Sequence, residues 1–445
     1  MPHSGPMSGM VPARVQRCSV QRERFNMALK ERGPLGGHLG TPCAVCCEFY
    51  LRMNLVWALS EEPENESDEG KLEKSGEPGE AGEPEEEAEG IIETHTGELI
   101  EEGVLVESPG SLVELDYGFP EDDGLLVPDV AAYYLQRRGV LQVLDGGIDV
   151  PLDTILNRGL SSDRSFFLKY LVYRDMRSKG RRLKAGTGEM PYLWFFGKPG
   201  RPCTHMVAVY SRNQSIPLEE LEGVLAVAGR FKKGVYLALV DEEGEVSYYE
   251  MKRFTTRPTA PYSPDRKDVA QVVGPMAVVW DPLGALSLYR EGYFGKPIGI
   301  RKPRSMDFEK PIMLSFTELL YLAGAGRVKL EGTEGEVSLA KLAEAALSEP
   351  NFRERYAVYH KLKGSGLVVK SGMKFGVDFA VYEYGPGLDH APFMIHVYPS
   401  ESSITPTEIV RAGRLAASVK KKFVVAQVDA KDGRVRMISF ARAKP

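Results

Sequence analysis

Two periods of apolar residues alternate in the second half of the chain, a helical period near 3.6 and a strand period of 2. Ser315 begins a helical pattern that ends at Gly326. A second helical pattern places Tyr356, Tyr359 and Leu362 on one face. Segments with alternating or continuous apolar residues follow and predict strands. The predicted strands cover 367–370, 377–384, 392–399, 423–429 and 434–442, with a further helix at 404–421.

The same order of elements occurs earlier in the chain, with recurring residues at shifts of 186 to 188. One-residue drifts between blocks are what loop insertions produce, and chance would not preserve the order of blocks. The chain is a tandem duplication. We predict an α/β (α+β) fold in which each copy has a small N-terminal α/β subdomain followed by an α/β subdomain with a small mixed sheet. The matched blocks are 127–143 with 314–330, 170–186 with 356–372, and 235–246 with 423–435.

Residues 1–90 differ in composition from both copies. Pro, Gly, Arg and Cys fill the first part, and Glu, Pro, Gly and Ser fill residues 60–90. Such a composition buries too little apolar surface to offset chain entropy, so we predict a disordered tail, with Met53 as one candidate for the true start. The predicted divisions are a tail at 1–90, a first copy at 91–257, a linker at 258–275 and a second copy at 276–445.

Charge is unevenly distributed. The 445 residues carry a formal net charge of −6. Residues 61–90 hold 14 acidic side chains against Lys71 and Lys74, a net of −12, so the rest of the chain sums to +6. A mildly basic remainder is compatible with RNA phosphate as a partner.

The apolar runs and the cysteines set limits on the class of protein. No run approaches the roughly 20 apolar residues of a membrane span, and the N-terminus lacks the features of a secretory signal. We therefore expect a cytoplasmic protein without a membrane partner. Cys43 and Cys46 have zinc-ligand spacing, but no second pair follows, so we interpret them and Cys47 as free thiols and expect no metal site.

Three residues of the second copy occur in specific contexts: Tyr382 in FGVDFAVYEYG, His390 in GLDHAPFMIHVY and Lys421 in SVKKKFVVA. With the YxVYxxLxxxGxxxKxG helix before them, these blocks resemble the C-terminal domain of archaeal tRNA-splicing endonucleases of the tandem-repeat homodimeric type. The resemblance covers roughly residues 91–445 and is strongest over 351–445, where it implies a nuclease subdomain.

The resemblance implies a metal-independent, cofactor-free catalytic triad that cuts precursor tRNA at the intron boundaries of a bulge–helix–bulge motif. Tyr382 would take the proton of the ribose 2′-OH, His390 would protonate the leaving 5′-oxygen, and Lys421 would stabilise the pentavalent phosphate. The implied products are a 2′,3′-cyclic phosphate and a 5′-hydroxyl. Internal transesterification needs such a base, acid and cation. A histidine, with a usual pKa of about 6.5, suits the acid, whereas a tyrosine at about 10 needs a nearby cation to favour its phenolate.

Other interpretations of the second copy compete with this one. Asp378 and Asp389 suggest a carboxylate nuclease that binds a metal. The nearest third acid is Glu383, which is an odd number of residues from Asp378. An unbroken strand would therefore point Asp378 and Glu383 to opposite faces. His396 is interpreted as a packing or surface residue. A non-catalytic RNA-binding or scaffold subunit and a restriction-type DNA nuclease are further alternatives. The complete triad argues against the scaffold.

The first copy lacks most of the triad. Counting from Lys184 places Phe196 at the position of Tyr382. The histidine position falls on Pro202 at a shift of 188 or on Thr204 at a shift of 186, and His205 matches neither. Lys233 remains where Lys421 predicts a lysine. We therefore expect a structural, catalytically silent first copy.

The resemblance also implies RNA contacts and a homodimer. Arginines at two places in the family sandwich a bulged base through cation–π contact, and nearby lysines are expected to contact phosphate. An acidic loop of the silent unit docks into a basic pocket of another subunit, and a C2 dimer fits a substrate with two cut sites. The corresponding residues are Arg414, Arg436, Lys370 and Lys420 for RNA, and Asp241, Glu242 and Glu243 for the docking loop.

Overall fold

The computed structural model describes residues 93–445 except 187–191, 198–201, 257–266, 301–302, 304–306, 389 and 400. The predicted tail, its cysteines, Met53 and Asp389 therefore lie outside the described residues. Within the described ranges, no helix is long and apolar enough to cross a membrane.

The N-terminal subdomain of the first copy is a mixed sheet packed against helices. Its strands follow the order β3-β4-β2-β1-β5-β6 among the residues described. Strand β1 pairs antiparallel with β2 and parallel with β5. The elements are β1 (His95–Ile100), β2 (Gly103–Val106), α3 (Ser111–Glu114), β3 (Phe119–Glu121), β4 (Gly124–Val127), α4 (Asp129–Arg137), β5 (Leu141–Asp145), β6 (Ile148–Asp149) and α5 (Leu152–Ser162).

The N-terminal subdomain of the second copy repeats this topology. Its order β15-β16-β14-β13-β17-β18 has the same antiparallel and parallel neighbours, so the duplication includes both subdomains. The elements are β13 (Asp268–Val273), β14 (Met276–Val279), α8 (Pro282–Gly292), β15 (Lys296–Pro297), β16 (Ile312–Ser315), α9 (Phe316–Gly324), β17 (Val328–Gly332), β18 (Gly335–Glu336) and α10 (Leu339–Leu347).

One predicted boundary is wrong. The linker was expected to reach residue 275, but β13 occupies Asp268–Val273 and pairs with β14 and β17 inside the second copy. The second copy therefore begins about eight residues earlier than predicted. Strand β13 is short and directly follows Pro- and Thr-rich residues, so composition alone does not separate it from the linker.

The nuclease subdomains of the two copies share a ten-stranded sheet within the described part of the chain. Its order is β19-β20-β21-β23-β24-β12-β11-β9-β8-β7. The first-copy elements are α6 (Phe166–Ser178), β7 (Arg182–Ala185), β8 (Leu193–Gly197), β9 (His205–Ser211), β10 (Ile216–Pro217), α7 (Leu218–Arg230), β11 (Gly234–Val240) and β12 (Val246–Arg253). The second-copy elements are α11 (Phe352–Lys363), β19 (Val368–Ser371), η1 (Met373–Phe375), β20 (Phe379–Tyr382), β21 (Phe393–Tyr398), β22 (Ser403–Ile404), α12 (Pro406–Ser418), β23 (Lys422–Val428) and β24 (Val435–Arg442).

The two halves of this sheet are related by an internal twofold axis. Strands β12 and β24 pair antiparallel with Met251 opposite Phe440, and each is the sixth residue of its strand. In the small β10–β22 ladder, Ile216 pairs with Ile404, which lies at the repeat shift of 188. Equivalent residues that pair with each other define a pseudo-dyad, so the two copies form an internal dimer.

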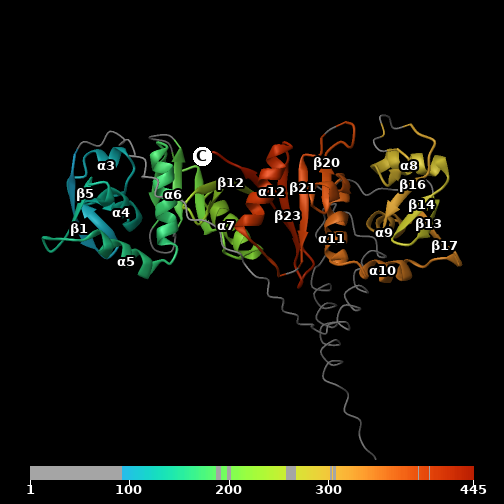
Figure 1. The fold of residues 1–445 in the computed structure, drawn as a ribbon, viewed down its shortest axis with the longest axis horizontal. Helices are drawn as coiled ribbons and strands as arrows, with labels where there is room; N and C mark the ends of the chain where they lie inside the picture. The colour runs from blue at the N-terminus through green and yellow to red at the C-terminus, as the bar shows by residue number, and fades with distance from the viewer. Residues whose placement is uncertain are drawn as a thin grey trace, which may run out of the picture. The chain divides into compact units, whose positions relative to one another are not determined.

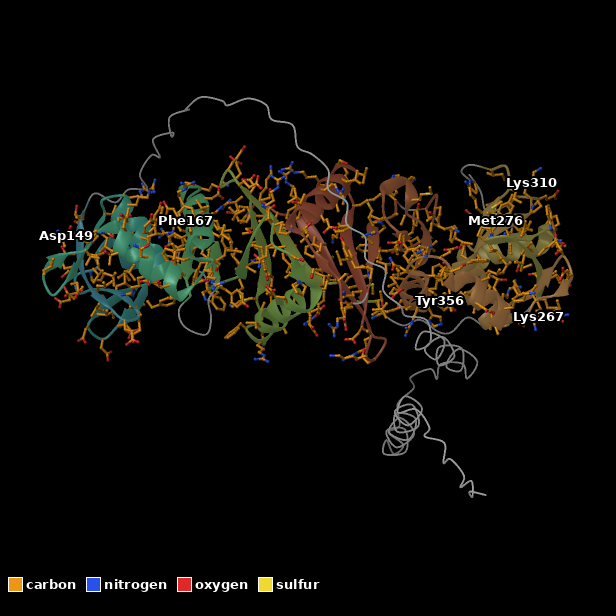
Figure 2. All side chains as sticks on the ribbon, turned by 60° about the horizontal axis from the view of Figure 1, so that its bottom comes forward. Asp149, Phe167, Lys267, Met276, Lys310 and Tyr356 are labelled. Carbon is orange, nitrogen blue, oxygen red and sulfur yellow. The ribbon has the colours of Figure 1, made fainter. Side chains whose placement is uncertain are left out.

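The central strands are apolar because helices cover both of their faces. In β23, Phe423 and Val425 belong to the core that includes α12, whereas Val424 and Ala426 belong to the core that includes α11. Figure 1 shows α12 beside β23. The predicted aromatic face of α11 is buried, including Tyr356, which is labelled in Figure 2. The predicted α/β fold with a duplicated arrangement is confirmed.

Candidate active site

The sheet register brings the three predicted catalytic residues to one edge. Strand β20 runs antiparallel to β21, and Val381 pairs with Phe393. Strand β23 runs parallel to β21, and Lys422 pairs with the same Phe393. Tyr382 follows Val381, Lys421 precedes Lys422, and the loop that carries His390 leads into β21. All three residues therefore lie at the same end of three adjacent strands, which we call the edge.

Lys421 is linked directly to the histidine loop. Its Nζ donates to the main-chain carbonyl of Ala391, the residue after His390. The ammonium also lies 5.7 Å from the centroid of the Phe375 ring. A left-handed Lys420, with φ of 55°, turns the chain between α12 and β23 just before Lys421. This turn fixes the direction in which the lysine leaves the sheet.

Tyr382 and His390 differ in exposure. Tyr382 is half-buried against a cluster formed by Tyr289, Tyr293 and Val368. His390 is exposed. The two side chains at this edge therefore differ in their access to solvent.

The first copy has the same edge with other side chains. Phe195 pairs with His205 as Val381 pairs with Phe393, so Phe196 takes the place of Tyr382. Lys233 Nζ donates to the carbonyl of Cys203 at 2.6 Å, as Lys421 donates to the carbonyl of Ala391. The histidine position is therefore Pro202, not Thr204.

His205 is the first residue of β9 and is partly buried. Its ring stacks on Tyr236 with centroids 4.0 Å apart. Burial lowers the pKa of His205, and the charge of Glu250 only partly offsets that effect. The histidine occupies the position of Phe393 and takes no part in an edge site.

The predicted RNA-binding residues are in different environments. Arg414 on α12 and Lys420 after it are exposed. Arg436 on β24 is ion-paired with Asp429 and lies 3.6 Å from a carboxylate oxygen of Glu219, with 26% of its side chain exposed. A base that stacks on Arg436 would meet a guanidinium already oriented by two acids.

Lys370, predicted to contact an RNA phosphate, already has partners within the chain. Its ammonium donates to the carbonyls of Tyr293 and Gly295 and to the carboxylate of Glu318, the last at 3.2 Å. These acceptors all belong to the N-terminal subdomain of the second copy. The surroundings of Lys370 are therefore those of a structural cation rather than of an exposed phosphate contact.

The predicted docking loop is an exposed turn between β11 and β12. Asp241 accepts hydrogen bonds from the amides of Glu243 and Glu245 at 3.0 and 2.9 Å, which shapes the turn. Glu242 lies 3.3 Å from Arg212 and accepts a hydrogen bond from Asn213. The loop therefore presents three exposed carboxylates, one of which already has a cation within the chain.

The carboxylate alternative centres on Asp378, at the opposite end of β20 from Tyr382. Asp378 accepts a hydrogen bond from the Val397 amide at 2.8 Å and lies 2.9 Å from His396 Nδ1. Burial raises the pKa of Asp378, but these hydrogen bonds and the charge of Arg355 outweigh it and lower the pKa overall. Asp378 and His396 thus form a local pair that joins neighbouring strands.

Two residues near the edge were missed by sequence reasoning. Glu318 and Tyr293 lie in the N-terminal subdomain, yet both contact the nuclease subdomain through Lys370. The Ser315-x-x-Glu318 spacing is a capping-box signal and would have shown that Glu318 is ordered at the start of α9. No local signal shows that it also binds a lysine from another subdomain.

Comparison with known families defines the class of this fold and site. A family model for the tRNA intron endonuclease catalytic C-terminal domain matches residues 166–248 and 352–437, which are the two nuclease subdomains. The model for the N-terminal domain of the same endonucleases matches residues 270–343.

Individual relatives agree. A tRNA-splicing endonuclease of Hyperthermus butylicus is 44% identical over 178 residues, covering 40% of this chain and 98% of that protein. The tRNA-splicing endonuclease of Methanococcoides burtonii is 29% identical, over 78% of this chain and 99% of that protein. That of Methanosarcina mazei is 30% identical, over 72% of this chain and 92% of that protein. The chain belongs to the tRNA-splicing endonuclease family. It is an endoribonuclease that cleaves introns from tRNA, as the sequence predicted.

Proposed function

We propose that the second copy cuts precursor tRNA at both boundaries of a bulge–helix–bulge motif, with Tyr382, His390 and Lys421 as the catalytic residues. The observation that carries this proposal is their convergence at one end of β20, β21 and β23, where Lys421 donates to the carbonyl of Ala391, the residue after His390. A half-buried base, an exposed acid and a cation at one edge are the groups that internal transesterification requires.

In the proposed reaction, Tyr382 accepts the proton of the ribose 2′-OH, and the 2′-oxygen attacks the adjacent phosphorus. The bond from phosphorus to the 5′-oxygen breaks as His390 donates a proton to that oxygen. Lys421 stabilises the additional negative charge on the phosphate oxygens in the transition state. The products are a 2′,3′-cyclic phosphate and a 5′-hydroxyl. The triad supplies each proton transfer and the charge, so the reaction as written needs no metal ion.

RNA binding and assembly involve residues outside the triad. Arg414 and Arg436 are the candidates for stacking on a bulged base, and Lys420 for a phosphate contact. One catalytic copy per chain supplies one active site, whereas a substrate with two cut sites calls for two. We therefore propose a cytoplasmic C2 homodimer in which the exposed acidic turn of the first copy docks on the partner.

The test is incubation of the protein with an intron-containing precursor tRNA in EDTA, followed by identification of the end groups. We expect two cuts, cyclic phosphate and 5′-hydroxyl ends, and no cleavage of DNA. Cleavage that requires an added divalent cation, or that leaves a 5′-phosphate, would contradict the mechanism. Cleavage by a Tyr382→Phe variant at the wild-type rate would remove the tyrosine from it.

A further inference from the structure

An ion pair between a buried carboxylate and a partly buried lysine joins the two subdomains of the catalytic copy. Lys370 on β19 lies 3.2 Å from the carboxylate of Glu318 on α9, and Glu318 is 8% exposed. Lys370 also donates to the carbonyls of Tyr293 and Gly295. Charges withdrawn from water persist only when close geometry and additional hydrogen bonds offset their desolvation. We call Glu318 and Lys370 the subdomain joint.

The acid of the joint is well satisfied. One oxygen of Glu318 accepts a hydrogen bond from the Gly295 amide at 3.0 Å, and the other accepts from the Ser315 amide and hydroxyl, both at 3.1 Å. Burial raises the pKa of Glu318, but the Lys370 charge and these amides outweigh it and lower the pKa. The carboxylate of Glu318 is therefore ionised at neutral pH.

The joint lies on the same face of the sheet as Tyr382. On β19, Val368 is two residues from Lys370, and Val368 pairs directly with Tyr382 on β20. Side chains two apart on a strand, or directly opposite across an antiparallel pair, share a face. Tyr289 and Tyr293 pack with Val368 and Tyr382 on this face.

Tyr293 also packs against the loop that follows Tyr382 in the sequence. A Cβ added to Gly385 would lie 2.3 Å from Cζ and 2.7 Å from the hydroxyl oxygen of Tyr293, so the glycine backbone rests directly on the ring. Gly385 has a φ of 127°, a conformation that other residues rarely adopt. Lys370 binds the main-chain carbonyl of this same tyrosine, so the joint holds the backbone that carries the ring against which the loop packs.

The first copy keeps the lysine but pairs it with a different acid. Helices α4 and α9 correspond residue for residue, and Ala131 stands where α9 has Glu318. Lys184 occupies the place of Lys370, and its ammonium lies 3.3 Å from Asp116 and 5.5 Å from the centroid of the Phe196 ring. The carboxylate at this helix position, Glu318, is thus present only in the copy that carries the triad, and the first copy uses Asp116 from the loop after α3 instead.

We propose that Glu318, Lys370 and Tyr293 are positioning residues for Tyr382, so that the N-terminal subdomain of the second copy is part of the active site. The inference rests on the proposed role of Tyr382 as the base. Displacing a reacting group by about 1 Å can reduce a rate by about 10²-fold. Loss of the joint should therefore slow the chemical step without weakening RNA binding.

The test is single-turnover cleavage by Lys370→Met at saturating enzyme, with the RNA dissociation constant measured over a range of salt concentrations. We expect a loss of about 10²-fold in rate, with an unchanged dissociation constant and salt dependence. Lys184→Met is the matched control, because it breaks the corresponding contact in the first copy. It should lower the melting temperature without lowering the cleavage rate.

A second arm tests whether the residues act through Tyr382. Added to Tyr382→Phe, Lys370→Met should cause no further loss, whereas a merely structural role would give additive losses. Should Lys370→Met not fold, Tyr293→Gly serves instead, since Tyr293 has a φ of 56° that glycine adopts without strain. It should also slow cleavage.

Each outcome separates this inference from the proposed function. A normal rate with weaker, less salt-dependent binding would make Lys370 a phosphate contact and overturn the inference while leaving the triad intact. A normal rate in Tyr293→Gly would also overturn it. If Tyr382→Phe itself cleaves at the wild-type rate, the proposed base is wrong, and that result is obtained before any joint variant is made.

Discussion

The two copies use one backbone arrangement to hold different side chains at corresponding positions. At the sheet edge, Lys233 and Lys421 both donate to a main-chain carbonyl. A phenylalanine and a proline, Phe196 and Pro202, accompany the first lysine where a tyrosine and a histidine accompany the second. The retained lysine shows that this contact forms without the tyrosine and the histidine and therefore serves the fold. In the proposed function, catalysis therefore depends on two residues, Tyr382 and His390, added to an edge that both copies share.

The subdomain contacts of the two copies differ in a related way. Arg177 in the first copy is fully buried and donates to the carbonyls of Leu115 and Asp116 at 2.7 and 2.8 Å. Lys363 stands at the same helix position in the second copy and donates to the Gly292 carbonyl at 2.8 Å. The guanidinium of Arg177 satisfies several acceptors at once. The ammonium of Lys363 is instead poorly solvated, because it is buried beside the charge of Lys370.

The largest expected difference between the copies concerns the acid. His390→Ala should slow single-turnover cleavage by roughly 10²–10⁴-fold, because protonation of the leaving oxygen is lost, while RNA affinity stays near normal. Pro202→Ala, at the corresponding position of the first copy, should leave the rate unchanged. An unaltered rate in His390→Ala would remove the histidine from the mechanism.

The lysines give the next largest contrast. Lys421→Ala should reduce the cleavage rate by roughly 10²–10³-fold, since one cation no longer stabilises the transition-state charge. Lys233→Ala should not, because Phe196 and Pro202 leave its edge without a base or an acid. Rates measured side by side with one precursor tRNA decide the matter, and equal losses would mean that the first copy is also catalytic.

The acidic turn of the first copy has no equally acidic counterpart in the second, and its replacement should affect assembly. Changing Asp241, Glu242 and Glu243 to Ala together should shift the protein towards monomer in light scattering and reduce cutting. Removing one side of desolvated interface charge pairs costs roughly 2–5 kcal/mol. Deleting residues 1–90 removes more negative charge yet should preserve the dimer. A triple variant that stays dimeric at low micromolar concentration would refute the docking role.

The smallest effect concerns pH and the helix position shared by Arg177 and Lys363. Burial and the charge of Lys370 lower the pKa of Lys363 to about 8. Between this value and the unfolded value of about 10.4, the unfolded state binds more protons, so stability should rise with pH across that interval. Lys363→Met should flatten the rise in denaturant unfolding measured at pH 8 and 10. A variant that keeps the full rise would assign it to other groups.

Much of the fold was accessible from sequence because its signals are local. The aromatic face of α11, the capping residues before α9 and the apolar strand β23 each follow from side-chain periodicity within one element. The substitution of Phe196 at the tyrosine position followed from counting along the repeat, and the β8–β9 register agrees with that count. The start of the second copy was misplaced because β13 is short and follows a segment of linker composition.

The amino-acid sequence by itself determined the duplication, the types of elements and their order, since these depend on spacings within each copy. Only the tertiary structure decided how the copies join through Met251 and Phe440 and which partner Lys370 has. Glu318 is 52 residues from Lys370, and a basic side chain beside a catalytic strand is equally compatible with a phosphate or a carboxylate. The choice between them depends on which subdomain surface packs against the strand, and that is set by long-range packing rather than by local pattern.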